Sequence, residues 1–233
     1  MAKNQKNGGI EKHKRVNDIL MGPLERPALA YLVKITPSWV SPDMLTIFGF
    51  LAGILIGVSY LLTNLDKNFL WLANLGFVLN WLGDSLDGNL ARYRKIERPR
   101  YGFFIDHAVD IITEVFIFLG LAFSPYVDFK IAILALIAYL CMTNLVFLIT
   151  SVEGVFQISY GRLGPTEARI IAMSANTIIF FAGNPQIQLP FAIISLYNLI
   201  IIGVIILLTT FFTYTTISHG IALSRSDRAL QKK

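Results

Sequence analysis

The sequence predicts an all-α integral membrane protein: six transmembrane helices, preceded by an N-terminal amphipathic helix at the membrane interface. Three observations support this fold class. The 233 residues are 55% hydrophobic and 15% charged, and their mean hydropathy of +0.60 is far above that of an ordinary soluble domain. The apolar residues gather in six stretches, each about as long as a bilayer crossing requires. The charged residues lie mostly between these stretches.

Residues 1–41 form the predicted cytoplasmic and interfacial segment. Its polar beginning lacks the apolar core of a cleavable signal peptide, so insertion is expected to use the mature helices. Residues 10–35 mix leucines and isoleucines with basic residues. This mixture is typical of an amphipathic helix pair, broken near Pro23, that lies on an anionic cytoplasmic leaflet. A disordered basic tail is the alternative for the first ten residues only.

The boundaries of the six spans follow from capping and turn residues. Ser41 before Pro42 is a typical N-cap with a proline in the first helical turn. Pro99 ends or restarts a helix, and Gly183-Asn184-Pro185 predicts a turn. The expected spans are 43–63, 69–95, 100–123, 129–152, 165–182 and 190–218.

The basic residues predict the topology. All lysines and arginines except Lys67 and Lys130 lie before the first span, in the even-numbered connections or after the last span. By the positive-inside rule, both termini are then cytoplasmic. We therefore expect a single membrane domain over residues 1–233, with a six-helix bundle over 42–218 and a cytoplasmic tail over 219–233.

Two further features concern packing. Gly49, Gly53 and Gly57 recur every four residues and leave a smooth stripe for close helix contact, which offers one surface for a homodimer. The single cysteine, Cys141, lies in an apolar run, where a packing role is expected. It permits no disulfide within one chain and so does not indicate a redox compartment.

Four aspartates lie inside or at the ends of the second and third spans: Asp84, Asp87, Asp106 and Asp110. Inserting one carboxylate at the membrane centre costs about 2.5–3.5 kcal/mol of free energy. Four carboxylates therefore require roughly 10 kcal/mol of compensating interactions. Their spacings of three and four residues place each pair on one helix face. Because the two helices run antiparallel from one connection, the four acids can meet at one depth. Hard carboxylate oxygens suit Mg²⁺ or Mn²⁺, and two such ions roughly 3.5–4 Å apart would clamp a phosphate.

A basic collar adjoins the acids and consists of Arg92, Arg94, Lys95, Arg98 and Arg100. A metal site ringed by cations at the cytoplasmic interface favours a polyphosphate ester as ligand. The rival hypothesis is a cation transporter or channel, because intramembrane acids also line ion paths. That hypothesis explains the carboxylates but not the neighbouring Gly88 and Ala91, nor a collar that repels cations.

The pattern D-x-x-D-G-x-x-A-R, followed by a spacer and G-x-x-x-D-x-x-x-D, resembles the signature of the CDP-alcohol phosphotransferases, also called CDP-alcohol phosphatidyltransferases. Its positions are occupied without a departure by Asp84, Asp87, Gly88, Ala91, Arg92, Gly102, Asp106 and Asp110. The six-span plan matches as well, so the resemblance covers most of the chain. It implies an enzyme of phospholipid biosynthesis that transfers a phosphate-linked group from a CDP-activated donor to an alcohol and releases CMP.

The resemblance also implies roles for these residues. The first three aspartates bind the divalent metal that bridges the CDP pyrophosphate. Asp110, also near the metal, is the favoured general base for the acceptor hydroxyl. Gly88 and Ala91 let the nucleotide approach the backbone, Gly102 permits tight packing against it, and Arg92 lies near the phosphates or braces the acids. We further expect a homodimer, a membrane lipid as substrate and no nucleic-acid partner.

Two substrate branches remain open. In one, the donor is CDP-diacylglycerol and the acceptor is a small alcohol such as inositol phosphate, glycerol phosphate or serine. In the other, CDP-choline or CDP-ethanolamine reacts with diacylglycerol. The compact length resembles microbial members of the first branch, which we favour. The sequences Asp106-His107-x-x-Asp110 and Thr166-Glu167 resemble the aminoalcohol branch instead.

Five further polar residues are candidates for substrate binding: Asn80, Glu114, Arg162, Glu167 and Arg169. Asn80 shares the face of Asp84, with an interhelical hydrogen bond as the alternative. Glu114 continues the row of Asp106 and Asp110 by one turn, with a structural pair to another polar residue as the alternative. The two arginines would hold a phosphate or supply ordinary positive-inside charge. Glu167, at the start of the fifth span, would reach the same site from the cytoplasmic side.

Overall fold

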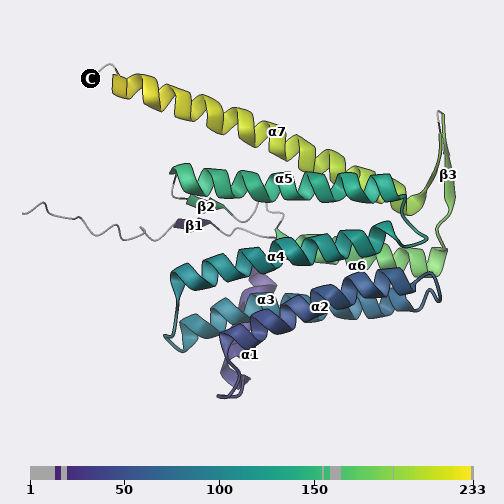
Figure 1. Ribbon diagram of the computed structural model, residues 1–233, viewed down its shortest axis with the longest axis horizontal. Coiled ribbons are helices and arrows are strands. Elements are labelled where there is room, and N and C mark those ends of the chain that lie inside the picture. Colours follow the sequence, from purple (N-terminus) through teal and green to yellow (C-terminus); the bar gives the residue numbers. More distant parts are fainter. Residues whose placement is uncertain (1–13, 17–19, 154, 158–163, 191, 232–233) are drawn as a thin grey trace, which may run out of the picture.

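The computed structural model describes residues 14–16, 20–153, 155–157, 164–190 and 192–231. These residues form seven helices and two short two-stranded sheets. In chain order they are β1 (Lys14–Val16), α1 (Gly22–Ile35), α2 (Pro42–Leu62), α3 (Phe69–Tyr93), α4 (Pro99–Ala122), α5 (Phe129–Glu153), β2 (Val155–Gln157), α6 (Pro165–Ala182), β3 (Gln186–Leu189), β4 (Ala192–Ser195) and α7 (Leu196–Gln231). Figure 1 shows α2 to α7 running roughly along the long axis of the molecule, with α1 lying across one end of α2 and α3.

The predicted helix starts are confirmed where proline and a cap coincide. The Ser41 hydroxyl accepts a hydrogen bond from the Met44 amide at 3.2 Å. Pro42, Pro99 and Pro165 each lie in the first turn of their helix. This position suits proline because an amide at the start of a helix has no intrahelical partner. The bounds of α2 to α6 therefore agree with the predicted spans to within two residues.

The N-terminal prediction is partly wrong. Residues 14–16 form a strand that pairs in parallel with residues 155–157, which follow α5. A single helix, α1, then begins at Gly22, and Pro23 lies in its first turn instead of breaking a helix pair. Sequence periodicity could not show this pairing because the partner strand lies far along the chain. The remaining residues of the predicted helix pair before Leu20 lie outside the described residues.

The sixth predicted span, 190–218, also has the wrong bounds. Strands β3 and β4 form an antiparallel hairpin, and α7 begins only at Leu196 and continues to Gln231. Hydropathy alone does not separate a short apolar strand from the start of a helix. The hairpin projects from the end of the bundle where α6 ends and α7 begins (Figure 1).

The chain is a multi-pass integral membrane protein. Within the described residues, α2, α5 and α7 are long and apolar enough to cross a membrane, judged by length and composition. Helices α3, α4 and α6 carry the polar residues of the site described below, and these residues lower the hydropathy of their helices. Three helices of the described residues are therefore clear candidates for membrane spans, and the count of six stays a prediction.

The glycine stripe of α2 packs inside the chain, so its prediction as a dimer contact is wrong. A Cβ atom on Gly49 would lie 3.2 Å from the Asp84 amide of α3. A Cβ on Gly53 would overlap the Thr113 side chain, and one on Gly57 would overlap the backbone of α4. The stripe thus lets α3 and α4 approach α2 closely. Asp84 of α3 and Thr113 of α4 consequently line one cavity.

The connection from α1 to α2 is fastened to the end of α3. The Arg94 guanidinium donates to the carbonyls of Val40 at 2.5 Å and Pro37 at 2.8 Å. It also donates to those of Thr36 and Ser38 at 3.2 and 3.4 Å. One charged side chain therefore satisfies four carbonyls of a non-helical segment, beside the helix end that carries the aspartates.

Candidate active site

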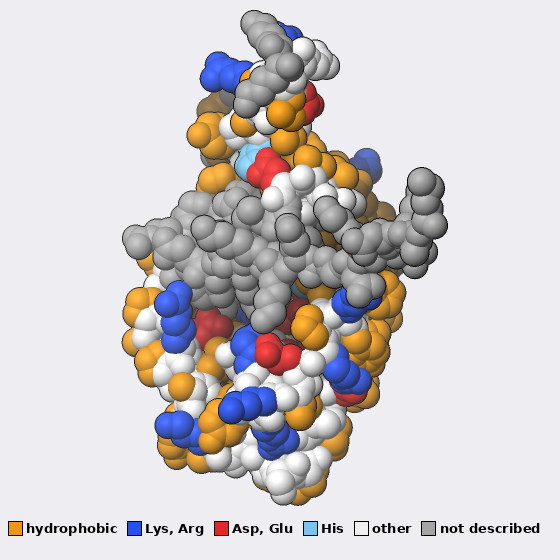
Figure 2. Space-filling view, turned by 90° about the vertical axis from the view of Figure 1, so that its left-hand side faces the viewer, with side chains coloured by type: hydrophobic (Ala, Val, Ile, Leu, Met, Phe, Trp, Pro, Cys, Tyr) orange, Lys and Arg blue, Asp and Glu red, His pale blue; other side chains and the backbone are white. Residues whose placement is uncertain are grey.

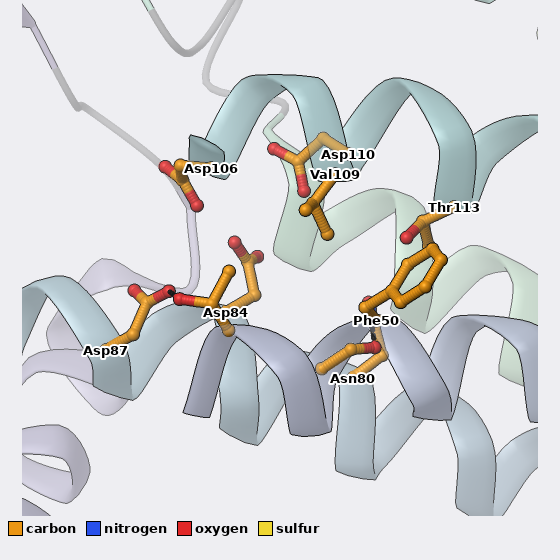
Figure 3. A pocket seen from close by; sticks show the side chains of 10 residues that line it. Phe50, Asn80, Asp84, Asp87, Asp106, Val109, Asp110 and Thr113 are labelled. Atoms are coloured by element: carbon orange, nitrogen blue, oxygen red, sulfur yellow. Dashed lines mark hydrogen bonds between the residues drawn. The ribbon is translucent and has the colours of Figure 1, made fainter. Parts of the chain in front are cut away.

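Three of the four predicted aspartates of α3 and α4 converge. Asp84, Asp106 and Asp110 each offer a carboxylate oxygen, and these three oxygens lie within 4.8 Å of one another. Figure 3 shows Asp106 and Asp110 projecting from α4 toward Asp84 and Asp87 on α3. All four aspartates line one cavity, together with residues of α2. The separation of the three oxygens is suited to joint coordination of a small cation.

Asp87 is held apart from this group of three. Its Oδ2 accepts a hydrogen bond from the Thr46 hydroxyl at 2.6 Å, and its Oδ1 accepts one from the Gly88 amide. The side chain is buried and directed toward α2. Sequence reasoning missed Thr46, although a threonine one turn into an otherwise apolar span was a visible signal. Its pairing with Asp87 depends on how α2 packs against α3.

Arg169 of α6 enters the same cluster. Its Nη2 donates to Asp84 Oδ2 at 2.6 Å, and its Nε donates to Asn80 Oδ1 at 2.9 Å. Asn80 in turn donates to the Gly49 carbonyl at 2.9 Å. Asn80 therefore makes the interhelical contacts given above as its alternative, and Arg169 faces the acids. Arg162 lies outside the described residues.

Two glutamates have different surroundings. Glu114 lies near the Tyr139 hydroxyl of α5 and near Arg169, and its buried Oε2 has no hydrogen-bond partner among the described residues. Tyr139 was not foreseen, because a tyrosine in an apolar stretch gives no specific signal. Glu167 is buried and accepts hydrogen bonds from the amides of Met21 at 2.8 Å and Gly164 at 2.9 Å. Both carboxylate oxygens of Glu167 thus accept hydrogen bonds, one from Gly164 at the start of α6 and one from Met21, the residue before α1.

His107 packs beside the aspartates on α4. Its ring stacks on Phe103 with a centroid distance of 4.3 Å. Its Nδ1 lies 3.6 Å from Asp106 Oδ2. Helix packing therefore accounts for its ring, while its nitrogen borders the carboxylate cluster.

The motif glycines and the collar surround the mouth of the site. A Cβ atom on Gly88 would lie 3.4 Å from Arg92 Nη1, and one on Gly102 would meet no atom of the described residues within 4 Å. Arg98 forms an ion pair with Asp43, which raises the pKa of the guanidinium. Figure 2 shows lysines and arginines gathered around acidic side chains on this end of the molecule. Basic and acidic side chains therefore meet at this end.

The donor set fits a hard divalent cation. The three converging ligands are all carboxylates, which suit Mg²⁺ or Mn²⁺ and not metals that prefer thiolates. Arg169 makes an ion pair with Asp84. Asp106 and Asp110 add two further carboxylates next to this pair. The cluster is thus consistent with a metal site and does not distinguish between the two ions.

The bundle and this cluster define a class: membrane proteins with a carboxylate-rich site, suited to a divalent cation, between two helices that share a connection. The comparison with family models identifies the family. The chain belongs to the CDP-alcohol phosphatidyltransferase family, whose model matches residues 39–215. The chain is therefore an enzyme of a transferase family of phospholipid biosynthesis.

Two known proteins illustrate the similarity. Cholinephosphotransferase 1 of Gallus gallus is 30% identical over 107 residues, which cover 43% of this chain and 32% of that protein. The match thus spans about a third of that relative's length. The solved structure of Mycobacterium tuberculosis phosphatidylinositol phosphate synthase, PgsA1, with CDP-DAG bound, superposes with a TM-score of 0.58 at 18% identity. That superposition covers 82% of this chain and 91% of the other.

Proposed function

We propose that this protein transfers a substituted phosphate group from a CDP-linked donor to an alcohol hydroxyl and releases CMP. The observation that carries the proposal is the convergence of Asp84, Asp106 and Asp110 within 4.8 Å, on the family's motif spacing. The basic collar beside these acids supports a polyphosphate ligand. A cation transporter would need the same acids but has no use for the collar.

The residues divide the chemistry between them. Asp84, Asp106 and Asp110, with Asp87 beside them, would hold one or two Mg²⁺ or Mn²⁺ ions, which would supply positive charge to stabilise the pyrophosphate and the departing CMP. Asp110 accepts the proton of the acceptor hydroxyl on a carboxylate oxygen. The acceptor oxygen then bonds to the phosphorus distal to cytidine as the bond from that phosphorus to the bridging oxygen breaks. Gly88, Ala91 and Gly102 leave room for the nucleotide, and Arg92 lies beside its phosphates.

We propose CDP-diacylglycerol as the donor and a small polar alcohol as the acceptor. The solved structure with CDP-DAG bound supports this choice, because the chain covers 91% of that compact protein. The second candidate is transfer from CDP-choline or CDP-ethanolamine to diacylglycerol. The identity of 30% to Cholinephosphotransferase 1 supports it, as do Asp106-His107 and Thr166-Glu167.

We also propose that α2 to α7 all cross the membrane as one domain, with both termini and the site on the cytoplasmic side. Asp84 of α3 and Arg169 of α6, two charged residues that lower the hydropathy of their helices, bind each other in the site. Helix α1 would lie at the interface, since it crosses the ends of α2 and α3 (Figure 1). A homodimer stays part of the proposal, through a surface other than the glycine stripe.

The test is CMP release by the purified protein in lipid nanodiscs with Mg²⁺ or Mn²⁺. One pool offers CDP-diacylglycerol with glycerol phosphate, inositol phosphate and serine. The other offers CDP-choline and CDP-ethanolamine with diacylglycerol. We expect release in the first pool only. CMP release in the second pool alone would support the second candidate. If metal binds but neither pool gives CMP release, the proposed function is contradicted.

A further inference from the structure

Thr113 is a buried polar residue that the proposed reaction does not use. It follows Asp110 on α4, is only 5% exposed and lines the acid-containing cavity. Its hydroxyl makes no hydrogen bond within the described part of the chain. Buried polar atoms in native proteins nearly always have a partner, so an unpaired hydroxyl facing a cavity indicates a ligand or water there.

Four other helical threonines donate to the backbone carbonyl four residues earlier, as is usual for threonine in membrane helices: Thr150, Thr177, Thr210 and Thr213. Thr113 departs from this behaviour although it lies in the middle of α4. A threonine can therefore be satisfied within a helix of this protein, and the Thr113 hydroxyl is not.

Gly53 explains the orientation of Thr113. A Cβ atom at Gly53 would overlap the Thr113 methyl group and would lie 3.1 Å from its Oγ1. The missing side chain on α2 thus makes a recess for the methyl group. Figure 3 shows the Thr113 oxygen directed into the space between α4 and the helices opposite, and Asp110 and Phe50 line the same cavity.

We propose that Thr113 forms a hydrogen-bonding subsite for the acceptor alcohol, and that this acceptor is a small polar molecule with a second hydroxyl or an amine beside its reacting hydroxyl. The inference rests on the proposed function, because Asp110 is there the base that receives the acceptor's proton. Thr113 lies three residues beyond Asp110, about 4.5 Å along the helix axis. A hydroxyl at that distance reaches the group next to the reacting oxygen. Glu114, the next residue, lies near Tyr139.

The experiment compares Thr113→Val with Thr113→Ser in the full-length protein. Calorimetry titrates glycerol phosphate, inositol phosphate and serine into Mn²⁺-loaded protein in nanodiscs, and CMP release gives KM for the donor and the acceptor. Valine keeps the shape that fills the recess at Gly53, whereas serine keeps the hydroxyl. Thr150→Val is the matched control, because Thr150 is equally buried, at 5% exposed, but donates within α5.

We expect Thr113→Val to weaken binding of the preferred acceptor and to raise its KM about three- to tenfold, the effect of one hydrogen bond. Donor KM and Mn²⁺ affinity should not change, and Thr113→Ser and Thr150→Val should resemble the wild type. Equal losses in the valine and serine variants would assign Thr113 to packing and overturn the inference. So would unchanged acceptor binding in Thr113→Val, no binding of any of the three alcohols to the wild type, or CMP release confined to the diacylglycerol pool. Acceptor binding without CMP release from any donor would contradict the proposed function alone.

Discussion

Polar groups are buried between helices at both ends of this bundle, but the two clusters are built differently. At the end away from the aspartates, Asn176 Oδ1 accepts hydrogen bonds from the hydroxyls of Tyr60 at 3.0 Å and Tyr197 at 2.6 Å. Asn176 Nδ2 donates to Asn74 at 2.8 Å, and Asn74 donates to Thr177 at 3.2 Å. This cluster joins α2, α3, α6 and α7 with neutral groups that satisfy one another.

The aspartate end instead concentrates negative charge. Asp84 has Arg169 as its partner and Asp87 has Thr46, whereas Asp106 and Asp110 bring further carboxylates to within 4.8 Å of Asp84. A bundle that can satisfy its buried amides this well has no structural need for such a concentration of charge. The difference indicates that the neutral cluster stabilises the fold and that the acidic cluster is held ready for a ligand.

The largest expected effect comes from Asp110→Asn. The substitution keeps the shape of the side chain but removes the carboxylate that accepts the acceptor's proton. We expect CMP release to fall by at least about 10²–10⁴-fold, the usual contribution of a general base. The thermal unfolding temperature should stay close to that of the wild type. Asp227→Asn, on the exposed end of α7, is the control. Undiminished CMP release in Asp110→Asn would remove this residue from the mechanism.

The metal ligands provide a second test, which ranks two neighbouring aspartates. Asp84 belongs to the group of three converging oxygens, whereas Asp87 is bonded to Thr46 and Gly88. We expect Asp84→Asn to weaken Mn²⁺ binding by about 10–100-fold and Asp87→Asn to weaken it less. Electron paramagnetic resonance of bound Mn²⁺ measures both affinities. Equal losses would mean that all four aspartates share the ion equally.

The neutral cluster should show the reverse behaviour. Asn176→Leu leaves the hydroxyls of Tyr60 and Tyr197 without their shared acceptor. We expect the free energy of unfolding to fall by about 1–3 kcal/mol, the cost of unsatisfied buried groups. Mn²⁺ affinity and acceptor KM should stay unchanged. Equilibrium unfolding in mixed detergent micelles measures the first quantity, and a loss of metal binding in a folded Asn176→Leu protein would contradict the separation of the two clusters.

How far the sequence predicts these features depends on whether a residue's role is local. Pro42, Pro99 and Pro165 mark helix starts through the local chemistry of the first turn, and these boundaries are confirmed. The aspartates of each helix share a face because of helical periodicity alone, and three of the four converge.

Roles that depend on a distant partner could not be predicted in the same way. Gly53 in the sequence indicates that another helix approaches α2 closely. It does not indicate that the neighbouring side chain is Thr113 of the same chain. From the sequence, Arg169 could equally bind a phosphate or supply positive-inside charge. Its contact with Asp84 depends on the packing of α6 beside α3. The strand pairing of residues 14–16 with 155–157 and the hairpin before α7 are likewise tertiary outcomes, without a periodic signal of their own.

The smallest expected effect tests how Asp87 is positioned. Thr46→Val removes the hydroxyl that donates to Asp87 at 2.6 Å but keeps the bulk of the side chain. We expect binding of CDP in the presence of Mn²⁺ to weaken about three- to tenfold, the effect of losing one ordinary hydrogen bond that positions Asp87. Thr210→Val, on the exposed part of α7, is the control because that hydroxyl bonds only within its own helix, to the Ile206 carbonyl. If calorimetry finds the same CDP affinity in both variants, the Gly88 amide alone suffices to hold Asp87. The contact between α2 and α3 then serves packing and not nucleotide binding.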